Sequence, residues 1–275
     1  MNVLIYGKGL WHTWEDALGS SSTLWNNFPF VEKVISSESP DSTTHIDMIE
    51  KNETVIIPLS VHDILNCPKG FLSLIPSKRI LTCFARKDYF YSFIESQQLQ
   101  DYLPTKVDIG AKDKSYPFIL KRVDLSSGIG VSKIRDEQML SEVLLDSIFM
   151  GQELLAQEYI IGDTEYVTHV ICRDGEVVWS ATLEGPVPHT GINKGAFAEE
   201  ISELDSNIFQ VFCKIFKLSN FSGPACINFR VLDGTPKIFE INPRFGGSLM
   251  LPKFRAQLIE SIQALLTNAH LQSDN

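Results

Sequence analysis

The sequence predicts two folding units, a small α/β domain over residues 1–84 and a larger α+β domain over residues 85–275. Short apolar runs alternate with helical patterns in the first third of the chain, which is typical of a parallel sheet with helices on its faces. From Tyr116 onward the expected strands are longer, and hairpin turns join them. With 44% hydrophobic and 21% charged residues, the chain has the composition of a globular protein with a sizeable core.

Four buried strands are expected in the first domain, because its short apolar runs are bounded by polar residues, glycine or proline. These runs cover residues 2–7, 30–35, 54–60 and 79–83. Helices are expected between the strands, in "HIDMIEKN" (45–52) and "VHDILN" (61–66). In "YGKGLW", Gly-x-Gly follows the first strand, but His12 stands where a dinucleotide-binding fingerprint has its third glycine, so a tight turn is favoured there.

The second domain begins with an amphipathic helix over residues 86–99 and continues with strands that turn back on one another. The segments "RDGE" and "LDGT" are strong hairpin signals, because Asp-Gly readily adopts the backbone of a tight turn. The expected strands are 117–123, 130–134, 154–160, the hairpin 165–185 and the two strands of "GPACINFRVLDGTPKIFEINPR". The expected helices are 136–149, 207–219 and 256–271.

Charge and cysteine content argue against several classes of protein. The 34 acidic residues outnumber the 24 basic ones, and the formal charge of −10 argues against binding along a nucleic-acid backbone. Five scattered cysteines without CxxC spacing favour buried thiols and a reducing compartment. "MNVLIYG" lacks the basic start of a signal peptide, and no apolar stretch has the length of a membrane span. We therefore expect a cytoplasmic protein that binds no membrane, with a homodimer left open.

The segment "PFILKRVDLSSGIGVSKI" joins two strands through a loop that suits phosphate groups. Lys121 stands at the end of the first strand and supplies a positive charge. The loop residues Ser126, Ser127, Gly128 and Gly130 are small, so that backbone N–H groups can approach phosphate oxygens. The loop has no Gly-Lys-Ser/Thr and a strand follows it, so it is not a Walker loop. Taken alone, such a loop is more often a simple turn.

The segment "AQEYIIGDTEYV" has the features of a nucleoside-binding edge. Glu158, Tyr159 and Ile160 end an apolar strand whose backbone N–H and C=O groups can face a purine. Glu165 follows a Gly-Asp turn, where its carboxylate can accept hydrogen bonds from both ribose hydroxyls. Taken alone, a connecting hairpin with solvated acids explains the segment better.

The hairpin "GPACINFRVLDGTPKIFEINPR" gathers oxygen ligands on neighbouring strands. Glu240 and Asn242 are two residues apart and share one face of a strand, and the hairpin brings Asn228 close to them. Such oxygens suit Mg²⁺, which takes further ligands from water and phosphates. Arg244 then faces a charge-rich reaction centre. The opposite face, which is expected to meet the core, carries Phe239 and Ile241.

The order of these stretches resembles the ATP-grasp superfamily, and the resemblance covers essentially the whole chain. The pattern runs from Lys87 through Lys121 and the Gly/Ser loop to Glu-x-x-x-Gly-x-x-Glu and Glu-x-Asn-Pro-Arg. The resemblance implies two α+β lobes that clamp ATP, with a lid subdomain at about 115–158, and it makes residues 1–84 a pre-ATP-grasp domain. It also implies two Mg²⁺ ions, or Mn²⁺ in their place. The implied roles are phosphate binding by Lys87 and Lys121, adenine binding by Glu158, Tyr159 and Ile160, ribose binding by Glu165, and metal binding by Asn228, Glu240 and Asn242.

Within this superfamily, the pattern is similar to the synthetase domain of the carbamoyl-phosphate synthase large chain. "VPHTGINKGAFAEE" is similar to that family's His-Thr-Gly loop, which implies that His189 lies near the phosphoryl-transfer site. Asn228 stands where many ATP-grasp enzymes carry a carboxylate and where the carbamoyl-phosphate family carries an amide. At 275 residues the chain is far shorter than that synthase, so the synthase's substrate is not carried over.

The resemblance implies an ATP-dependent ligase for a small-molecule carboxylate and an amine, or a thiol. The carboxylate attacks the γ-phosphate, and the amine then displaces phosphate from the acyl phosphate, which Arg244 stabilises. His189 is either a general base or a loop residue without a chemical role. A kinase that stops after phosphoryl transfer and a non-catalytic ATP-binding scaffold are the alternatives. Candidates for binding a substrate carboxylate are Lys194, Arg230, Lys253 and Arg255, and the loop 191–200 is a candidate flap.

Overall fold

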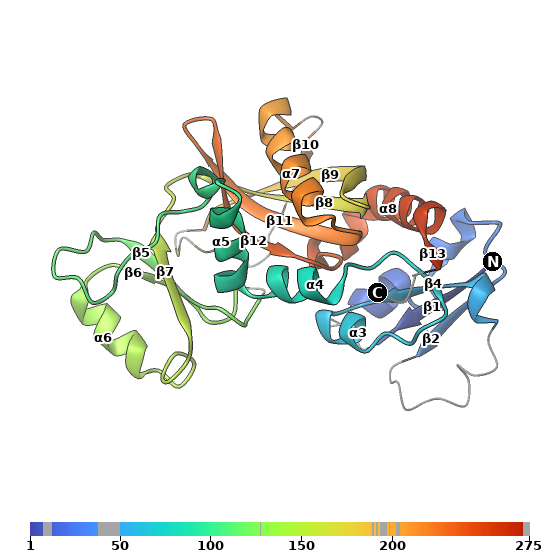
Figure 1. The fold of residues 1–275 in the computed structure, drawn as a ribbon, viewed down its shortest axis with the longest axis horizontal. Coiled ribbons are helices and arrows are strands. Elements are labelled where there is room, and N and C mark those ends of the chain that lie inside the picture. The colour runs from blue at the N-terminus through green and yellow to red at the C-terminus, as the bar shows by residue number, and fades with distance from the viewer. Residues whose placement is uncertain are drawn as a thin grey trace.

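The computed structural model shows an elongated molecule, and the described part of the chain forms three sheets (Figure 1). The described residues are 1–7, 13–37, 50–126, 128–188, 190, 192, 197, 199–201 and 204–271. A mostly parallel sheet lies at one end, a large antiparallel sheet lies in the middle and a three-stranded sheet lies at the other end (Figure 1). We call them the N-terminal sheet, the body sheet and the lid sheet. None of the helices in the described ranges is long and apolar enough to cross a membrane.

The N-terminal sheet has the predicted parallel pairing. Strand β1 (Asn2–Tyr6) lies between β2 (Lys33–Ser37) and β3 (Thr54–Pro58), and β4 (Leu72–Ser73) follows β3. Strand β13 (His270–Leu271) pairs antiparallel with β4, so the C-terminal part of the chain completes this sheet. The helical segments around the sheet are α1 (Thr13–Leu18), α3 (Val61–Leu65) and the 3-10 helices η1 (Thr23–Asn27) and η2 (Lys51–Glu53).

A strand was expected at residues 79–83. This prediction is wrong, because these residues lie in helix α4 (Lys78–Ala85). The Ser77 side chain accepts a hydrogen bond from the backbone N–H of Ile80 and so caps the helix. A short apolar run does not distinguish a buried strand from a buried helix, and the cap favours the helix here. The helix expected at 45–52 falls mainly outside the described residues.

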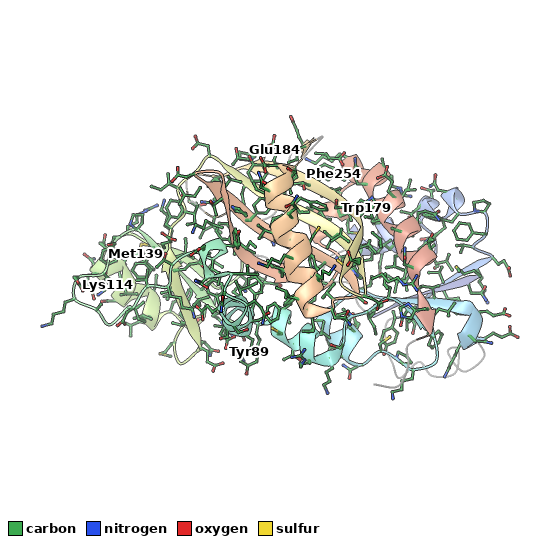
Figure 2. All side chains as sticks on the ribbon, turned by 45° about the horizontal axis from the view of Figure 1, so that its top comes forward. Tyr89, Lys114, Met139, Trp179, Glu184 and Phe254 are labelled. Atoms are coloured by element: carbon green, nitrogen blue, oxygen red, sulfur yellow. The ribbon has the colours of Figure 1, made fainter. Side chains whose placement is uncertain are left out.

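The lid sheet is formed by three antiparallel strands in the order β6-β5-β7. They are β5 (Phe118–Arg122), β6 (Val131–Ile134) and β7 (Leu154–Glu158). Helix α6 (Glu137–Leu145), capped by Asp136, packs on the sheet. Lys114 and Met139 mark this part of the molecule in Figure 2. The domain limits at residues 84/85 and the lid limits at about 115–158 stay predictions.

The body sheet has five antiparallel strands in the order β10-β9-β8-β11-β12. They are β8 (Thr164–Arg173), β9 (Glu176–Pro186), β10 (Glu199–Ile201), β11 (Gly223–Leu232) and β12 (Thr235–Asn242). Two tight turns connect β8 to β9 and β11 to β12. Their central residues have positive φ, with 50° and 85° at Asp174 and Gly175 and 50° and 74° at Asp233 and Gly234. This backbone is the one that the two Asp-Gly signals predict.

Helices cover both faces of the body sheet. Helices α5 (Lys87–Ser96) and α7 (Ser206–Ser219) share one apolar core with α4, β11 and β12. Helix α8 (Arg255–Asn268) packs against the N-terminal sheet in a second core and lies between that sheet and the body sheet (Figure 1). Trp179 of β9, labelled in Figure 2, donates to Glu260 of α8 at 3.2 Å. The remaining 3-10 helices are η3 (Gln100–Tyr102), η4 (Gly247–Met250) and η5 (Pro252–Phe254).

Candidate functional site

A cavity of about 530 Å³ is lined by residues of the lid sheet, the body sheet, α5 and the segment that follows β12. It brings together the three chemistry-bearing stretches of the sequence. The predicted site residues that line it are Lys87, Lys121, Ser126, Gly128, Glu158, Tyr159, Ile160, Glu165, Asn228, Glu240, Asn242 and Arg244. The convergence of these side chains on one cavity makes it the candidate functional site.

Three predicted residues are not placed at the cavity. Gly130 does not line it, and its φ of +64° gives it a turn-forming role in the loop. An added Cβ at Gly130 would lie 3.1 Å from Leu125 Cδ1, so the loop is also tightly packed there. Ser127 and His189 lie outside the described residues.

Two buried lysines meet at one end of the cavity. Lys121 of β5 is 3% exposed, and Lys87, the first residue of α5, is 6% exposed. The Lys87 Nζ lies 3.2 Å from Glu240 Oε2 and donates to the Leu125 carbonyl in the Gly/Ser loop. Burial, and then the charge of Lys87, lowers the pKa of Lys121 to about 7. A buried pair of lysines beside one carboxylate creates a local excess of positive charge that an anion would relieve.

A β-bulge explains how Lys121 is held. Asn228 pairs with Glu240 and Phe229 pairs with Ile238, so Phe239 is an extra residue on β12. The Lys121 Nζ donates to the Phe239 carbonyl at 3.0 Å. The bulge also corrects one expectation, because Phe239 lines the cavity instead of facing the core with Ile241.

Glu240 is the central carboxylate of this end of the site. Its Oε1 accepts from the Asn242 amide at 3.0 Å and from the Asn228 amide at 3.3 Å. Burial raises the pKa of Glu240, but Lys87, the Asn242 hydrogen bond and Lys121 outweigh this effect, so the pKa lies below its usual value. Glu240 is therefore ionised at neutral pH.

The donor set around Glu240 fits a hard cation that shares its ligands with a substrate. One carboxylate and two amide side chains line the cavity here. No group of three or more His, Cys, Asp or Glu side chains arranged as a metal site is found in the described part of the chain. Mg²⁺ commonly takes only one or two carboxylates and completes its coordination with water and phosphate oxygens. The residues therefore fit a Mg²⁺–phosphate group better than a metal held by protein alone.

Another part of the cavity wall is formed by the segment between β7 and β8. The Glu158 carboxylate accepts from the backbone N–H and the hydroxyl of Thr105, at 2.7 and 3.0 Å. The Glu158 side chain is thus already held by Thr105. The groups that this segment can offer to a nucleotide base are therefore mainly its backbone N–H and C=O groups. The Tyr159 ring packs under Lys133 of β6, whose Nζ lies 3.5 Å from the ring centroid.

Glu165 lies beside this segment and is paired with an arginine that the sequence did not connect with it. The Nη2 of Arg230 is 2.8 Å from Glu165 Oε2, and both side chains are buried. Burial raises the pKa of Glu165, and Arg230 opposes that rise. Arg230, a candidate for binding a substrate carboxylate, is therefore already bound to a carboxylate of its own chain.

Arg244 follows β12 and is 6% exposed at the cavity wall. Its Nη1 donates to the Phe245 carbonyl at 2.8 Å, and its Nη2 lies 3.5 Å from the Ser126 hydroxyl of the Gly/Ser loop. Arg244 thus contacts both the body and the loop to which Lys87 is hydrogen-bonded. The two other basic candidates contact their own chain: Lys253 donates to the Phe197 carbonyl, and Arg255 donates to Thr23 at 3.1 Å. Lys194 and most of the candidate flap lie outside the described residues.

Sequence reasoning missed a buried histidine behind the cavity wall. His169 of β8 has its Nε2 2.9 Å from the hydroxyl of Ser248, which lines the cavity. Burial, and then the charge of Arg244, lowers the pKa of His169 to about 3, so the ring is neutral. Its close approach requires glycine at position 246, because an added Cβ there would lie 2.4 Å from His169 Cε1. The Gly-Gly pair after Arg244 was the available signal.

These features are those of an ATP-grasp protein, and the chain belongs to that family. The family model described as "ATP-grasp domain" matches residues 85–248. The chain is 23% identical over 225 residues to the carbamoyl phosphate synthase arginine-specific large chain of Bacillus subtilis (strain 168). That match covers 74% of this chain and 22% of the relative, so the chain spans about a fifth of the relative's length. The family resemblance predicted from the motifs is thereby confirmed.

Solved structures extend the likeness to the N-terminal part of the chain. D-alanine–D-alanine ligase from Bacillus anthracis has a TM-score of 0.67 at 13% identity, over 97% of this chain and 96% of that one. L-amino acid ligase from Bacillus licheniformis has a TM-score of 0.60 at 19% identity, over 96% of this chain and 74% of that one. Phosphoribosylamine–glycine ligase from Thermotoga maritima has a TM-score of 0.64 at 16% identity, over 93% and 71%. These likenesses confirm the predicted ATP-grasp fold.

Proposed function

We propose that this chain is an ATP- and Mg²⁺-dependent ligase that joins a small-molecule carboxylate to an amine, or to a thiol, through an acyl phosphate. The observation that carries the proposal is the cavity between lid and body. One part of its wall carries Lys87 and Lys121 beside the carboxylate of Glu240, with Arg244 also in the lining, and another part carries a backbone edge and Glu165. These groups fit a triphosphate beside the basic side chains and a nucleoside beside the backbone edge.

The residues at the charged end have complementary roles in the proposed reaction. Lys87 and Lys121 bind phosphate oxygens, and Glu240, with Asn242 and Asn228, holds the metal. When bound, Mg²⁺ neutralises phosphate charge, and we include two ions, with Mn²⁺ as a substitute, in the proposal. Phosphoryl transfer depends mainly on such positioning and charge neutralisation.

The proposed chemistry has two steps. A carboxylate oxygen of the substrate bonds to the γ-phosphorus as its bond to the bridging oxygen breaks, and ADP leaves. The amine nitrogen then attacks the acyl carbon, loses its proton and expels inorganic phosphate. In this proposal Arg244 neutralises the charge of the acyl phosphate and of the oxyanion that forms on the way to the amide. His189 stays a candidate general base.

Small molecules, and neither nucleic acid nor a membrane, are the partners in this proposal. The formal charge of −10 supports the exclusion of nucleic acid. All five cysteines are free thiols, which supports the proposal of a reducing compartment such as the cytoplasm.

A phosphate-release screen tests the proposed function. The purified chain is incubated with ATP, Mg²⁺ and pairs of carboxylates and amines, and inorganic phosphate is measured. We expect a pair for which release requires both partners. ADP, measured in the same reactions, that forms with only one acceptor and together with a phosphorylated product in place of free phosphate identifies a kinase. ATP binding without turnover across the whole panel identifies a scaffold. Either of these two results contradicts the ligase.

A further inference from the structure

Arg230 is a buried arginine of the body sheet that lines the cavity. It lies on β11 and is 3% exposed. Its Nη1 donates to the Ile160 carbonyl at 2.7 Å, and its Nε and Nη2 donate to Glu165 Oε2 at 3.2 and 2.8 Å. One guanidinium therefore binds both the backbone between β7 and β8 and the carboxylate near the start of β8.

The same side chain also takes part in a contact between lid and body. The Tyr159 ring has Lys133 of the lid strand β6 at 3.5 Å from its centroid, and the guanidinium carbon of Arg230 at 5.4 Å. Tyr159 and Ile160 belong to the segment that leads from the lid sheet to the body sheet. Arg230 thus ties this connecting segment to β11, which is paired with a strand on each side.

The Glu165 carboxylate is oriented by this pairing. Both bonds from Arg230 end on Oε2, while Oε1 forms no hydrogen bond that is found among the described residues. Glu165 lines the cavity, so its unused oxygen is available to a ligand there. Two donors of one guanidinium converge on Oε2 and hold that oxygen from two directions, which leaves Oε1 on the other side of the carboxylate.

Building on the proposed function, we propose that Arg230 is the positioning residue for nucleoside recognition in this chain. It holds the Glu165 carboxylate so that Oε1 accepts from the ribose hydroxyls, and it holds the backbone at Ile160 at a fixed distance from that carboxylate. The base and the sugar are therefore recognised by groups that the same arginine side chain holds in place. Loss of Arg230 should weaken ATP binding and, above all, reduce the preference for ribose over deoxyribose.

A merely structural ion pair would behave differently. Removing one partner of a buried pair destabilises a protein wherever the pair lies. That effect would lower the stability of the fold and would weaken the binding of all nucleotides by the same factor. The ratio of the affinities for ATP and 2′-deoxyATP is insensitive to such a change, so this ratio is the decisive readout.

The experiment measures the binding of ATP and of 2′-deoxyATP to the whole purified chain by calorimetry, with Mg²⁺ present. The wild type should prefer ATP by about tenfold or more. Arg230→Met should bind ATP about 10- to 100-fold more weakly, and the ratio of its affinities for ATP and 2′-deoxyATP should be close to one. Arg173→Met is the matched control, because Arg173 is an exposed arginine at the far end of β8, and it should bind both nucleotides as the wild type does.

A second variant covers the case in which Arg230→Met does not fold. Arg230→Lys keeps the charge but has one nitrogen for two acceptors, so it should fold and lose much of the sugar preference. A wild-type preference for ATP in a folded Arg230 variant would overturn the proposal and leave the proposed function standing. A wild type that binds ATP and 2′-deoxyATP equally well would also overturn it. A wild type that binds no ATP would contradict the proposed function itself, and this inference with it.

Discussion

The charged part of the cavity contains three buried basic side chains and one ionised carboxylate. Lys87, Lys121 and Arg244 are each at most 6% exposed, and Glu240 is the carboxylate beside the two lysines. Such an arrangement costs free energy in the absence of an anion, because buried charges need partners. A triphosphate with its metal would supply the missing negative charge, which is why the proposal places ATP here.

Replacing the central carboxylate tests that reading. Glu240→Gln removes the negative charge that faces Lys87 and the metal, so ATP turnover should fall at least about 100-fold. Phosphate release under saturating substrates measures the effect, and circular dichroism checks the fold. Glu176→Gln, at a carboxylate paired with Lys217 on the surface, is the control and should keep full turnover. Undiminished turnover in Glu240→Gln would remove Glu240 from the metal site.

The buried His169 predicts a pH dependence of stability. Its pKa is about 3 in the folded chain, below the ordinary 6.5, so the unfolded chain binds more protons between these values. The free energy of unfolding should therefore fall by up to about 1.4 kcal/mol per pH unit as the pH drops from about 6.5 towards 3. His169→Gln should lose this part of the slope. Urea unfolding at several pH values measures it, and identical slopes in both proteins would contradict a neutral buried ring.

The predicted and the missed residues differ in how far along the chain their partners lie. Glu240 and Asn242 are two residues apart, and their shared face follows from the alternation of a strand. Arg230 and Glu165 are 65 residues apart, and His169 and Ser248 are 79 residues apart. No local pattern encodes such pairs, because they depend on the register between β8, β11 and the segment after β12.

At the scale of elements, the bulge in β12 decides which residues face the cavity. Strict alternation would place Phe239 on the core side together with Ile241. The register shift after Asn228 moves Phe239 to the cavity and leaves its carbonyl near Lys121. Nothing in the sequence marks this bulge, because it contains no glycine and follows from the pairing with β11.

The two Asp-Gly turns of the body offer a matched comparison. Gly175 and Gly234 both have positive φ, but only Gly175 is packed, with Lys217 Cα 3.0 Å from an added Cβ. Gly234→Ala should cost about 1 kcal/mol of unfolding free energy from backbone strain alone. Gly175→Ala should cost about 1 to 3 kcal/mol more, because α7 must shift. Urea unfolding compares the two variants, and equal losses would show that the turn does not pack on α7.

For the whole molecule, the sequence predicts whether each sheet is parallel or antiparallel better than it predicts which strands belong to that sheet. Alternating short strands and helices indicated the parallel sheet, and the Asp-Gly turns indicated the antiparallel one. The last element was expected to be helical through residue 271, but α8 ends at Asn268 and β13 joins the N-terminal sheet. Two residues are too few to carry a strand pattern, so only the packed fold reveals this pairing.

Calorimetric titration of the purified chain with ATP shows whether the cavity between lid and body binds ATP with Mg²⁺. We expect one nucleotide per chain, binding that depends on Mg²⁺, and an affinity at least about tenfold lower in Lys121→Met, because that variant lacks the buried amino group that faces the phosphates. A wild type that binds no ATP, or a Lys121→Met variant that binds ATP with unchanged affinity, would contradict this expectation.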